Sequence, residues 1–283
     1  MEKRVVFVTG ASSGIGRETV LLLAEKGFRV FAGVRKSADG AALAKAVGAS
    51  LTPVILDVTR AASIRAAARA IEAALEPDES FSLVNNAGIA VAAPLELLSV
   101  DDLRRQFEVN VFGHVAVTQA FLPVLRSRQG RIVFMGSLFG RIAVPLVSPY
   151  SSAKFALEAI VDAFAVELHP WKIHVSILEP GNIATPIWQK FKSRGLDAHG
   201  KSARGRQSLY KDAEASMHRL ADFFSRSGLT PRRVAKVVHR ALCARHPRTR
   251  YLVGWDANLL ARIVPLGTDR MRYWVIRRII APR

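Results

Sequence analysis

The sequence predicts an α/β fold, with a single doubly wound parallel sheet of about seven strands and helices on both faces. Three observations lead to this prediction. Short β-branched runs alternate with longer helical segments along most of the chain, which is typical of parallel sheets. The short runs are continuously apolar, as expected for strands that are buried on both faces. Glycine, proline or a polar residue closes several of these runs, where a turn is expected.

The expected strands are identified by their apolar runs and by the residues that end them. The first run is closed by Gly10, and the third ends at Asp57. The sixth run is closed by Pro180 and Gly181. The predicted strands cover residues 4–8, 29–33, 51–56, 81–84, 131–135, 174–178 and 250–253.

The expected helices lie between these runs. Residues 15–26 have helical periodicity and end before Gly27, which suits the residue that follows a helix. The stretch 63–75 is rich in alanine, the residue with the highest helix propensity. The predicted helices cover residues 15–26, 41–47, 63–75, 101–125, 150–168 and 230–243.

No linker divides the chain, so we expect its 283 residues (1–283) to form a single domain with a sizeable core. The stretch after the sixth strand is rich in glycine, serine and cations and follows a strand's carboxyl end, so we expect a substrate lid at 186–228. Residues 255–283 combine apolar residues with arginines and are expected to form a basic C-terminal helical extension. We expect this extension to pack against the body or a partner subunit. A position on a membrane or over the substrate cleft is the alternative.

The net charge of the chain is +18, and residues 226–283 hold 14 Lys and Arg residues against two acidic residues. We attribute this charge first to a compositional preference for arginine. Peripheral contact with an anionic membrane surface is the alternative. We expect no nucleic-acid partner, because no zinc-finger spacing, RNP motif or basic zipper is present.

The single cysteine, Cys243, excludes an internal disulfide and favours a reducing compartment. We therefore expect a cytoplasmic protein, with association at a membrane surface as the alternative. The N-terminal apolar run lacks the features of a signal peptide, and no apolar stretch approaches the roughly 20 residues that span a bilayer. We expect no metal site, because Cys243 has no metal-ligand partners at useful spacing.

Tyr150 and Lys154 are four residues apart on a predicted helix and therefore share one of its faces. A free tyrosine titrates at about 10, and a neighbouring positive charge favours the phenolate. We therefore expect Lys154, together with a cationic cofactor ring, to lower the pKa of Tyr150 toward neutrality. The pair alone is a weak indication, because this spacing often arises by chance.

A glycine-rich turn, Thr9-Gly10-Ala11-Ser12-Ser13-Gly14-Ile15-Gly16, lies directly between the first strand and the first helix. Glycines let the backbone turn sharply and approach a pyrophosphate closely. The N–H groups and the dipole of the following helix then face the anion. This turn predicts a dinucleotide site at the carboxyl edge of the sheet.

Five motifs in order resemble those of the short-chain dehydrogenase/reductase superfamily: Thr9-Gly10-x-x-x-Gly14-x-Gly16, Asn85-Asn86-Ala87-Gly88, Ser137, Tyr150-x-x-x-Lys154 and Pro180-Gly181. The resemblance covers about residues 4 to 190 and fits the small one-domain type. It implies a Rossmann-like sheet, hydride transfer with a nicotinamide cofactor, and assembly into a homodimer or homotetramer.

The resemblance also implies roles for four residues. Tyr150 matches the general acid/base that exchanges a proton with the carbinol oxygen. Lys154 matches the residue that lowers the pKa of that tyrosine and holds the nicotinamide ribose. Ser137 matches the hydroxyl that polarises the substrate oxygen, and Asn110 matches the residue that supports a proton relay through Lys154. A helix-kink asparagine is the simpler alternative for Asn110.

The cofactor residues implied by the resemblance lie in the turn after the first strand, after the second and third strands, after the fourth strand and after the sixth. They are Gly10, Ser12, Ser13, Gly14, Ile15, Gly16, Arg35, Lys36, Asp57, Val58, Asn86, Ala87, Gly88, Tyr150, Lys154, Pro180, Gly181, Ile183 and Thr185.

The end of the second strand indicates which dinucleotide is preferred. A carboxylate there would accept a hydrogen bond from the ribose 2′-OH of NAD, but Val34 occupies that position. Arg35 is placed for a bidentate contact to a 2′-phosphate, with Ser12 and Lys36 as helpers. The sequence therefore favours NADP(H), and NAD(H) stays open as the alternative.

The stretches around 140–145 and 175–182 look closest to a retinol and 17β-hydroxysteroid dehydrogenase-like branch, which implies a bulky hydrophobic alcohol or ketone. Apolar side chains are expected around the cleft, as is usual for small-molecule pockets: Leu138, Phe139, Val144, Leu146, Trp188 and Phe191. Two alternatives stay open. One is a 3-oxoacyl thioester reductase of lipid metabolism, and the other is a redox-silent dinucleotide sensor or scaffold.

Overall fold

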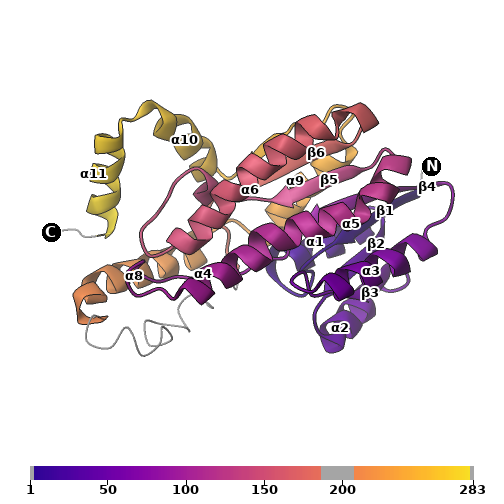
Figure 1. Cartoon of the computed structure of the whole chain (residues 1–283), viewed down its shortest axis with the longest axis horizontal. Coiled ribbons are helices and arrows are strands. Elements are labelled where there is room, and N and C mark those ends of the chain that lie inside the picture. Colours follow the sequence, from indigo (N-terminus) through magenta and orange to yellow (C-terminus); the bar gives the residue numbers. More distant parts are fainter. Residues whose placement is uncertain (1–2, 186–206, 281–283) are drawn as a thin grey trace.

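A seven-stranded, all-parallel sheet forms the centre of the computed structural model, which describes residues 3–185 and 207–280 (Figure 1). The strand order is β3-β2-β1-β4-β5-β6-β7, so the chain runs outward from β1 in both directions. The strands are β1 Lys3–Val8, β2 Arg29–Val34, β3 Leu51–Ile55, β4 Glu79–Asn85, β5 Arg131–Met135, β6 His174–Pro180 and β7 Arg250–Val253. The predicted doubly wound α/β fold is confirmed.

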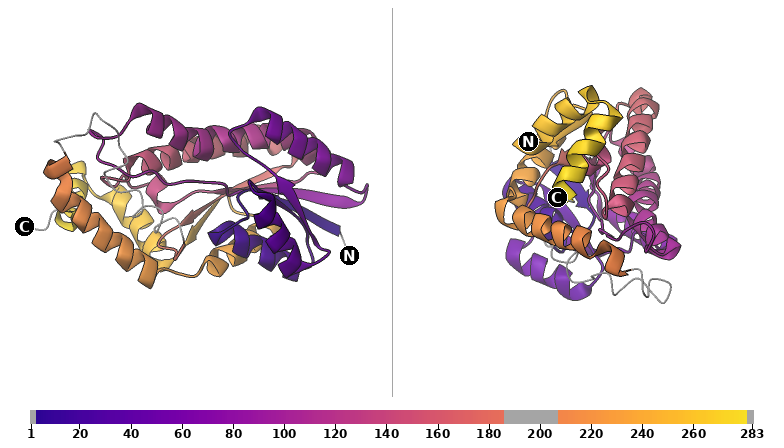
Figure 2. Two further views of the ribbon diagram at one scale, coloured as in Figure 1. Left: turned by 90° about the horizontal axis from the view of Figure 1, so that it is seen from below. Right: turned by 90° about the vertical axis from the view of Figure 1, so that its left-hand side faces the viewer.

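Helices cover both faces of this sheet, and Figure 2 shows the sheet between two helical layers. One face packs against α3 (Ala61–Ala74), α5 (Gly113–Ser127) and α6 (Ser148–Glu167). The other face packs against α1 (Gly14–Glu25), α2 (Ser37–Val47) and α9 (Pro231–Cys243). Side chains alternate along the strands, so in β1 Phe7 enters the first core and Val6 enters the second.

Two of the predicted helices differ from those observed. The helix expected to begin at residue 41 begins at Ser37, directly after β2. The long helix expected over 101–125 is divided into α4 (Val100–Phe107), a π-helical turn (Glu108–Phe112) and α5. Asn110 lies in the middle of this turn, and such turns inside helices often mark functional sites.

The C-terminal part of the chain is helical. The part of the predicted lid that the structure describes contains a short 3₁₀ turn (Gln207–Tyr210) and α8 (Lys211–Ser227), and residues 186–206 lie outside the described residues. The basic extension consists of α10 (Trp255–Ile263), a 3₁₀ turn (Val264–Leu266) and α11 (Asp269–Ile280). In Figure 1 these helices lie at the end of the molecule that is opposite to the N-terminus.

Within the described residues, no helix combines the length and the apolar character that a membrane crossing needs. The same part of the chain contains no group of three or more His, Cys, Asp or Glu side chains that could hold a metal ion.

Candidate active site

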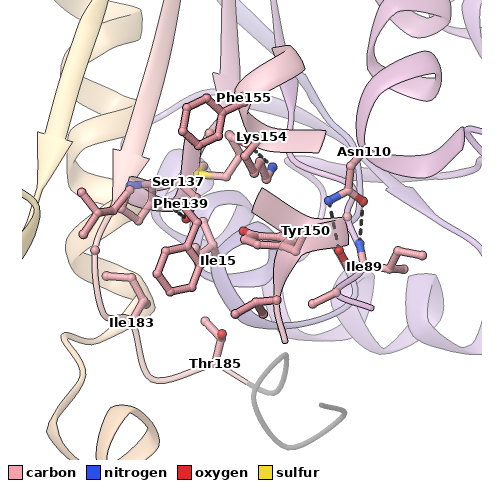
Figure 3. A pocket seen from close by; sticks show the side chains of 18 of the residues that line it. Ile15, Ile89, Asn110, Ser137, Phe139, Tyr150, Lys154, Phe155, Ile183 and Thr185 are labelled. Carbon is pink, nitrogen blue, oxygen red and sulfur yellow. Dashed lines mark hydrogen bonds between the residues drawn. The ribbon is translucent and has the colours of Figure 1, made fainter. Parts of the chain in front are cut away.

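A cavity of about 1430 Å³ opens at the carboxyl ends of the central strands. The glycine-rich turn and the segments after β2, β3 and β4 line one part of it, and Ser137, Tyr150 and Lys154 line the next (Figure 3). All but one of the predicted site residues border this cavity. The exception is Lys36, whose exposed side chain is not among the lining residues because the chain turns into α2 at this point.

The glycine-rich turn is held tightly against the loop after β4. Gly10 and Gly14 have φ of +66° and +56°, a region that favours glycine. A Cβ atom on Gly16 would lie 2.2 Å from the carbonyl oxygen of Gly10, so only hydrogen fits there. The amide Nδ2 of Asn86 donates to the carbonyl oxygens of Thr9 and Gly10, at 3.0 and 3.1 Å. The two loops therefore form one rigid unit.

Thr9 belongs to the same rigid unit, and it was not among the predicted site residues. Its Oγ1 accepts hydrogen bonds from the backbone N–H groups of Asn86 and Ala87, at 2.9 and 3.0 Å. Thr9 is fully buried, so these bonds are shielded from water. A threonine between an apolar strand and the first glycine is the sequence signal that could have identified it.

The segments after β2 and β3 form the end of the cavity away from Tyr150. The exposed Arg35 lines this end beside Asp57, and the backbone N–H of Thr59 donates to Asp57 Oδ1 at 3.0 Å. Partial burial works to raise the pKa of Asp57, but the hydrogen bonds from Thr59 and the nearby Arg35 bring it below its ordinary value. No carboxylate stands at the end of β2, where Val34 is buried.

A stripe of buried polar side chains fixes the next loop. Gln106, Asn110, His114 and Thr118 follow one another at intervals of four residues along α4, the π turn and α5, and all four are fully buried. Asn110 bonds both backbone groups of Ile89, at 2.9 and 3.0 Å, and Gln106 accepts from the N–H of Val91 at 2.7 Å. Both ends of the Asn110 amide are therefore occupied (Figure 3).

His114 belongs to this stripe and stays neutral. Its Nε2 lies 2.6 Å from the carbonyl oxygen of Ala87, so Nε2 carries the proton and donates. Full burial lowers the pKa of His114 to about 3, and the nearby Lys154 charge adds to the shift. The loop after β4 is thus held by bonds that do not titrate near neutral pH.

Ser137, Tyr150 and Lys154 come together from β5 and α6. The Tyr150 hydroxyl faces Ser137 (Figure 3), and its ring meets Phe139 edge-on at 6.3 Å between centroids. Lys154 lies behind the tyrosine, with Nζ 5.6 Å from the centroid of the Tyr150 ring. Figure 3 shows the phenol oxygen directed toward Ser137 and the Lys154 side chain above the tyrosine ring in this view.

The expected lowering of the tyrosine pKa is not found in the protein alone. Burial raises the pKa of Tyr150 to about 12, and the neighbouring Ser137 hydroxyl opposes the rise only in part. Lys154 does not offset this burial, because its ammonium donates to the carbonyl oxygen of Met135 at 2.5 Å. Burial also lowers the pKa of Lys154 to about 8. The expected lowering included the charge of a cofactor ring, so for the site with its cofactor bound it stays a prediction.

An ionic cluster lies one helical turn beyond Lys154. The carboxylate of Glu179 is fully buried and is held by Arg141, whose Nη2 donates to Glu179 Oε1 at 2.8 Å. Arg250 contacts Glu158 at 3.2 Å and Asp162 at 2.6 Å. Two arginines thus face three carboxylates. Burial raises the pKa of Glu158 to about 7, the Glu179 charge adds to the rise, and Arg250 and Arg141 oppose it.

We expect Glu158→Gln to stabilise the protein at neutral and alkaline pH. An unfolded glutamic acid titrates at about 4.3, so between about pH 4.5 and pH 7 the folded state keeps a proton that the unfolded chain has lost. The free energy of unfolding therefore falls as the pH rises through this window. Glutamine cannot ionise and avoids this loss. We therefore expect the free energy of unfolding to be about 1–3 kcal/mol higher in the variant at about pH 8 and little changed at about pH 5.

Denaturant unfolding at both pH values would measure this difference. Asp162→Asn is the matched control, because Asp162 also contacts Arg250 but is half exposed. We expect the control to show no alkaline gain. Equal stability of wild type and Glu158→Gln at about pH 8 would contradict the assignment of a raised pKa to Glu158.

The C-terminal helices form the far wall of the cavity. A position over the cleft was the alternative prediction for this part of the chain. Leu260 and Ile263 of α10 and Met271, Val275 and Ile276 of α11 all line the cavity. Ile276 also packs against the buried pair Leu146 and Val147. Leu138, Phe139 and Val144 line the cavity as expected, Leu146 lies in the core beside it, and Trp188 and Phe191 lie outside the described residues.

These features fit a dinucleotide. The glycine-rich turn has no room for side chains at Gly10 and Gly16, so its backbone can approach a pyrophosphate. The N-terminus of α1 directs N–H groups at the same place. The cavity then continues from Arg35 to Tyr150, past the loop fixed by Asn86.

Comparison with known proteins gives consistent matches. A family model described as short chain dehydrogenase matches residues 4–195. The chain is similar to 3-amino-tetrahydro-pyrrolizinone reductase of Xenorhabdus hominickii, with 39% identity over 259 residues that cover 91% of this chain and 89% of that protein. It is also similar to retinol dehydrogenase 5 of Mus musculus, with 34% identity over 292 residues that cover 96% and 89%.

A solved structure shows the same arrangement of elements. A short chain dehydrogenase from Burkholderia cenocepacia J2315, in complex with NADP, superposes with a TM-score of 0.73. The two sequences are 26% identical, and the alignment covers 99% of each chain. The likeness therefore extends beyond the sheet to the C-terminal part of the chain.

Proposed function

Because the chain belongs to the short-chain dehydrogenase family and is an NAD(P)-dependent oxidoreductase that acts on CH–OH groups, we propose that it interconverts hydrophobic secondary alcohols and ketones with NADP(H). The observation that carries the proposal is the position of Tyr150. Its phenol lines a cavity that joins the glycine-rich turn to an apolar wall, and Ser137 and Lys154 line the same part of that cavity.

The contacts of the polar residues support the roles that we propose for them. When a ketone is reduced, Ser137 and Tyr150 bind the carbonyl oxygen, and Tyr150 Oη gives its proton to the oxygen as it becomes an alcohol. In the reverse direction the phenolate takes that proton back. A bound nicotinamide supplies or accepts the hydride at the carbinol carbon. Donors aimed at the oxygen stabilise the negative charge that develops there.

Lys154 and Asn110 act behind the tyrosine. The ammonium of Lys154 lies close enough to the ring to favour the phenolate once the cleft is filled, and it can bind the hydroxyls of a ribose. Asn110 supports a proton relay by holding the Ile89 backbone with its side-chain amide. Gly88, which lines the cavity, lies next to that amide. The sequence resembles a retinol and 17β-hydroxysteroid dehydrogenase-like branch, so we propose retinoid or steroid substrates. Such apolar molecules suit the apolar part of the cavity.

Turnover of a carbonyl panel tests the proposed substrate class. We expect NADPH-dependent reduction of steroid, retinoid and long-chain ketones or aldehydes, with weak or no turnover of sugars and small hydroxy acids. Acyl thioesters belong in the same panel, because their preference over free ketones would favour the thioester reductase instead. A panel in which only small polar substrates react would overturn the proposal.

We expect Arg35→Ala to lose the preference for NADP(H). Arg35 is the cation at the adenosine end of the cavity, and a hydrogen bond to a charged group contributes about 1.5–3 kcal/mol. The KM for NADPH should therefore rise about 10- to 100-fold while that for NADH changes little. Lys36→Ala is the control, because it removes a neighbouring cation that does not line the cavity. A wild-type enzyme with a tenfold preference for NADH would contradict the role of Arg35.

A further inference from the structure

A row of exposed apolar side chains runs along α10, the 3₁₀ turn and α11. Leu266 is 84% exposed, Trp255 76%, and Tyr273 and Trp274 59% each. We call this surface the C-terminal face and define it by the exposed residues Trp255, Leu259, Leu260, Ile263, Leu266, Met271, Tyr273, Trp274 and Val275. Such a set is larger than the scattered apolar residues of an ordinary surface, and so it indicates a binding face.

Arginines surround these apolar side chains. Residues 255–280 contain five arginines, no lysine and two acidic residues. Asp256 faces inward and accepts from the N–H of Asn182 at 2.6 Å, and Asp269 is paired with Arg272. The other four arginines are exposed, and none has a carboxylate of the described residues within ion-pair distance: Arg262, Arg270, Arg277 and Arg278. The face is therefore both apolar and strongly cationic.

The two tryptophans and Tyr273 suit a boundary between water and lipid. Aromatic rings with one polar edge concentrate at the interfacial layer of a bilayer. Arg278 stacks over Trp274, with its guanidinium carbon 5.2 Å from the ring centroid, so the charge and the aromatic ring are presented together. Long basic side chains beside apolar ones can bind phosphates while the apolar side chains enter the lipid.

We propose that the C-terminal face binds the surface of an anionic phospholipid membrane. The helices would lie on the membrane, since neither has the length or apolar character to cross it. A second copy of the chain fits this surface less well, because two such faces in contact would bring many unpaired guanidinium groups together. The proposal concerns binding only and does not depend on the reaction that the cavity performs.

The position of the face relative to the cavity adds a second argument. Leu260, Ile263, Met271 and Val275 are exposed to solvent and also line the cavity. Tyr273 lines it too. The C-terminal face therefore borders the cleft, and its members outside the cavity lining are Trp255, Leu259, Leu266 and Trp274. A membrane in contact with this face would lie next to the opening of the cavity, where an apolar molecule dissolved in lipid could enter.

Vesicle flotation with the full chain tests the proposal. Vesicles of phosphatidylcholine are compared with vesicles that also contain phosphatidylglycerol, at low and high salt. We expect at least tenfold tighter binding to the anionic vesicles, and weaker binding at high salt because ions screen the attraction. Equal binding to both kinds of vesicle, or none to either, would overturn the proposal.

Two double charge-reversal variants distinguish binding by the C-terminal face from a general effect of net charge. Arg277→Glu/Arg278→Glu should weaken binding to anionic vesicles at least tenfold. Arg65→Glu/Arg69→Glu makes the same change in net charge on exposed positions of α3 and should change binding little. Equal loss in both variants would show a general charge effect and would overturn the proposal.

The aromatic contribution has its own matched pair. Trp274→Ala removes a tryptophan stacked under Arg278, and Trp171→Ala removes one stacked under Arg126, 4.4 Å from its ring centroid, after α6. Only Trp274→Ala should weaken vesicle binding, and thermal unfolding would show that both variants fold. Light scattering measures the oligomeric state in parallel. If the C-terminal variants dissociate an oligomer and leave vesicle binding unchanged, the face joins copies of the chain and the proposal fails.

Discussion

Replacing Tyr150 with phenylalanine is expected to lower kcat for carbonyl reduction about 10³-fold, within the range that general acid catalysis supplies. Phenylalanine keeps the ring that meets Phe139 edge-on and removes only the hydroxyl that faces Ser137. The fold and the dinucleotide cradle should therefore be unchanged. The loss would come from the missing proton donor, since the substrate oxygen would have to take its proton from water.

Steady-state kinetics and NADPH binding, measured together, check this expectation. We expect the dissociation constant for NADPH to change less than about threefold, which separates lost chemistry from lost binding. The high pKa of Tyr150 also predicts a direction for the pH dependence. The phenol is protonated at neutral pH and ready to donate, so reduction should be favoured at lower pH and alcohol oxidation at higher pH. Full activity in Tyr150→Phe would contradict the proposed mechanism.

Gly16→Ala is expected to weaken dinucleotide binding about 100-fold. The new methyl group would lie 2.2 Å from the Gly10 carbonyl oxygen and 2.4 Å from Asn86 Nδ2, so the glycine-rich turn and the loop after β4 must separate. That movement displaces the helix N–H groups from the pyrophosphate and breaks the Asn86 bonds to Thr9 and Gly10. Overpacking alone costs about 1–3 kcal/mol of folding free energy.

Calorimetric titration with NADPH would measure the affinity, and thermal unfolding would measure the stability. Arg17→Ala is a suitable control, because it changes the next residue of the same helix at an exposed position. We expect the control to bind NADPH as the wild type does. Unchanged affinity in Gly16→Ala would mean that the turn does not hold the pyrophosphate.

Most of the fold could be predicted because its signals are local. Buried parallel strands appear as short apolar runs, and the residue after each run marks the edge where the site forms, as Gly10, Asp57 and Pro180 do. The order of the motifs also predicted a shared cleft for Ser137, Tyr150 and Lys154, and all three line one cavity. The strands followed from local patterns, whereas the grouping of Ser137 with Tyr150 and Lys154 was implied by the family resemblance.

The features that the sequence did not predict depend on contacts between distant segments. The π turn at Asn110 accompanies hydrogen bonds to Ile89, which lies on another part of the chain. The pKa of Tyr150 depends on burial and on where the Lys154 ammonium points, and spacing reports neither. Lys36 is adjacent to Arg35 in sequence, but the chain turns into α2 at Lys36 and the Lys36 side chain does not line the cavity.

The C-terminal helices illustrate the same limit. Their apolar and basic residues were visible in the sequence, but nothing local indicated that α11 would return to contact Leu146 and Val147 and close the cleft. Residues 255–280 begin at the carboxyl edge of the sheet because β7 runs parallel to the other strands. Tertiary contacts therefore decided the role of this part of the chain.

The opposite positions of β1 and α11 in the molecule have a practical consequence. β1 begins at the far end of the molecule from α11, and α11 forms part of the cavity wall (Figure 1). An affinity tag, fluorophore or solid support attached at the amino end would leave the route to the cleft clear. The same attachment after α11 would lie close to the cavity wall and could block substrate entry. Low activity of a carboxyl-tagged protein would then not distinguish a blocked cavity from slow chemistry.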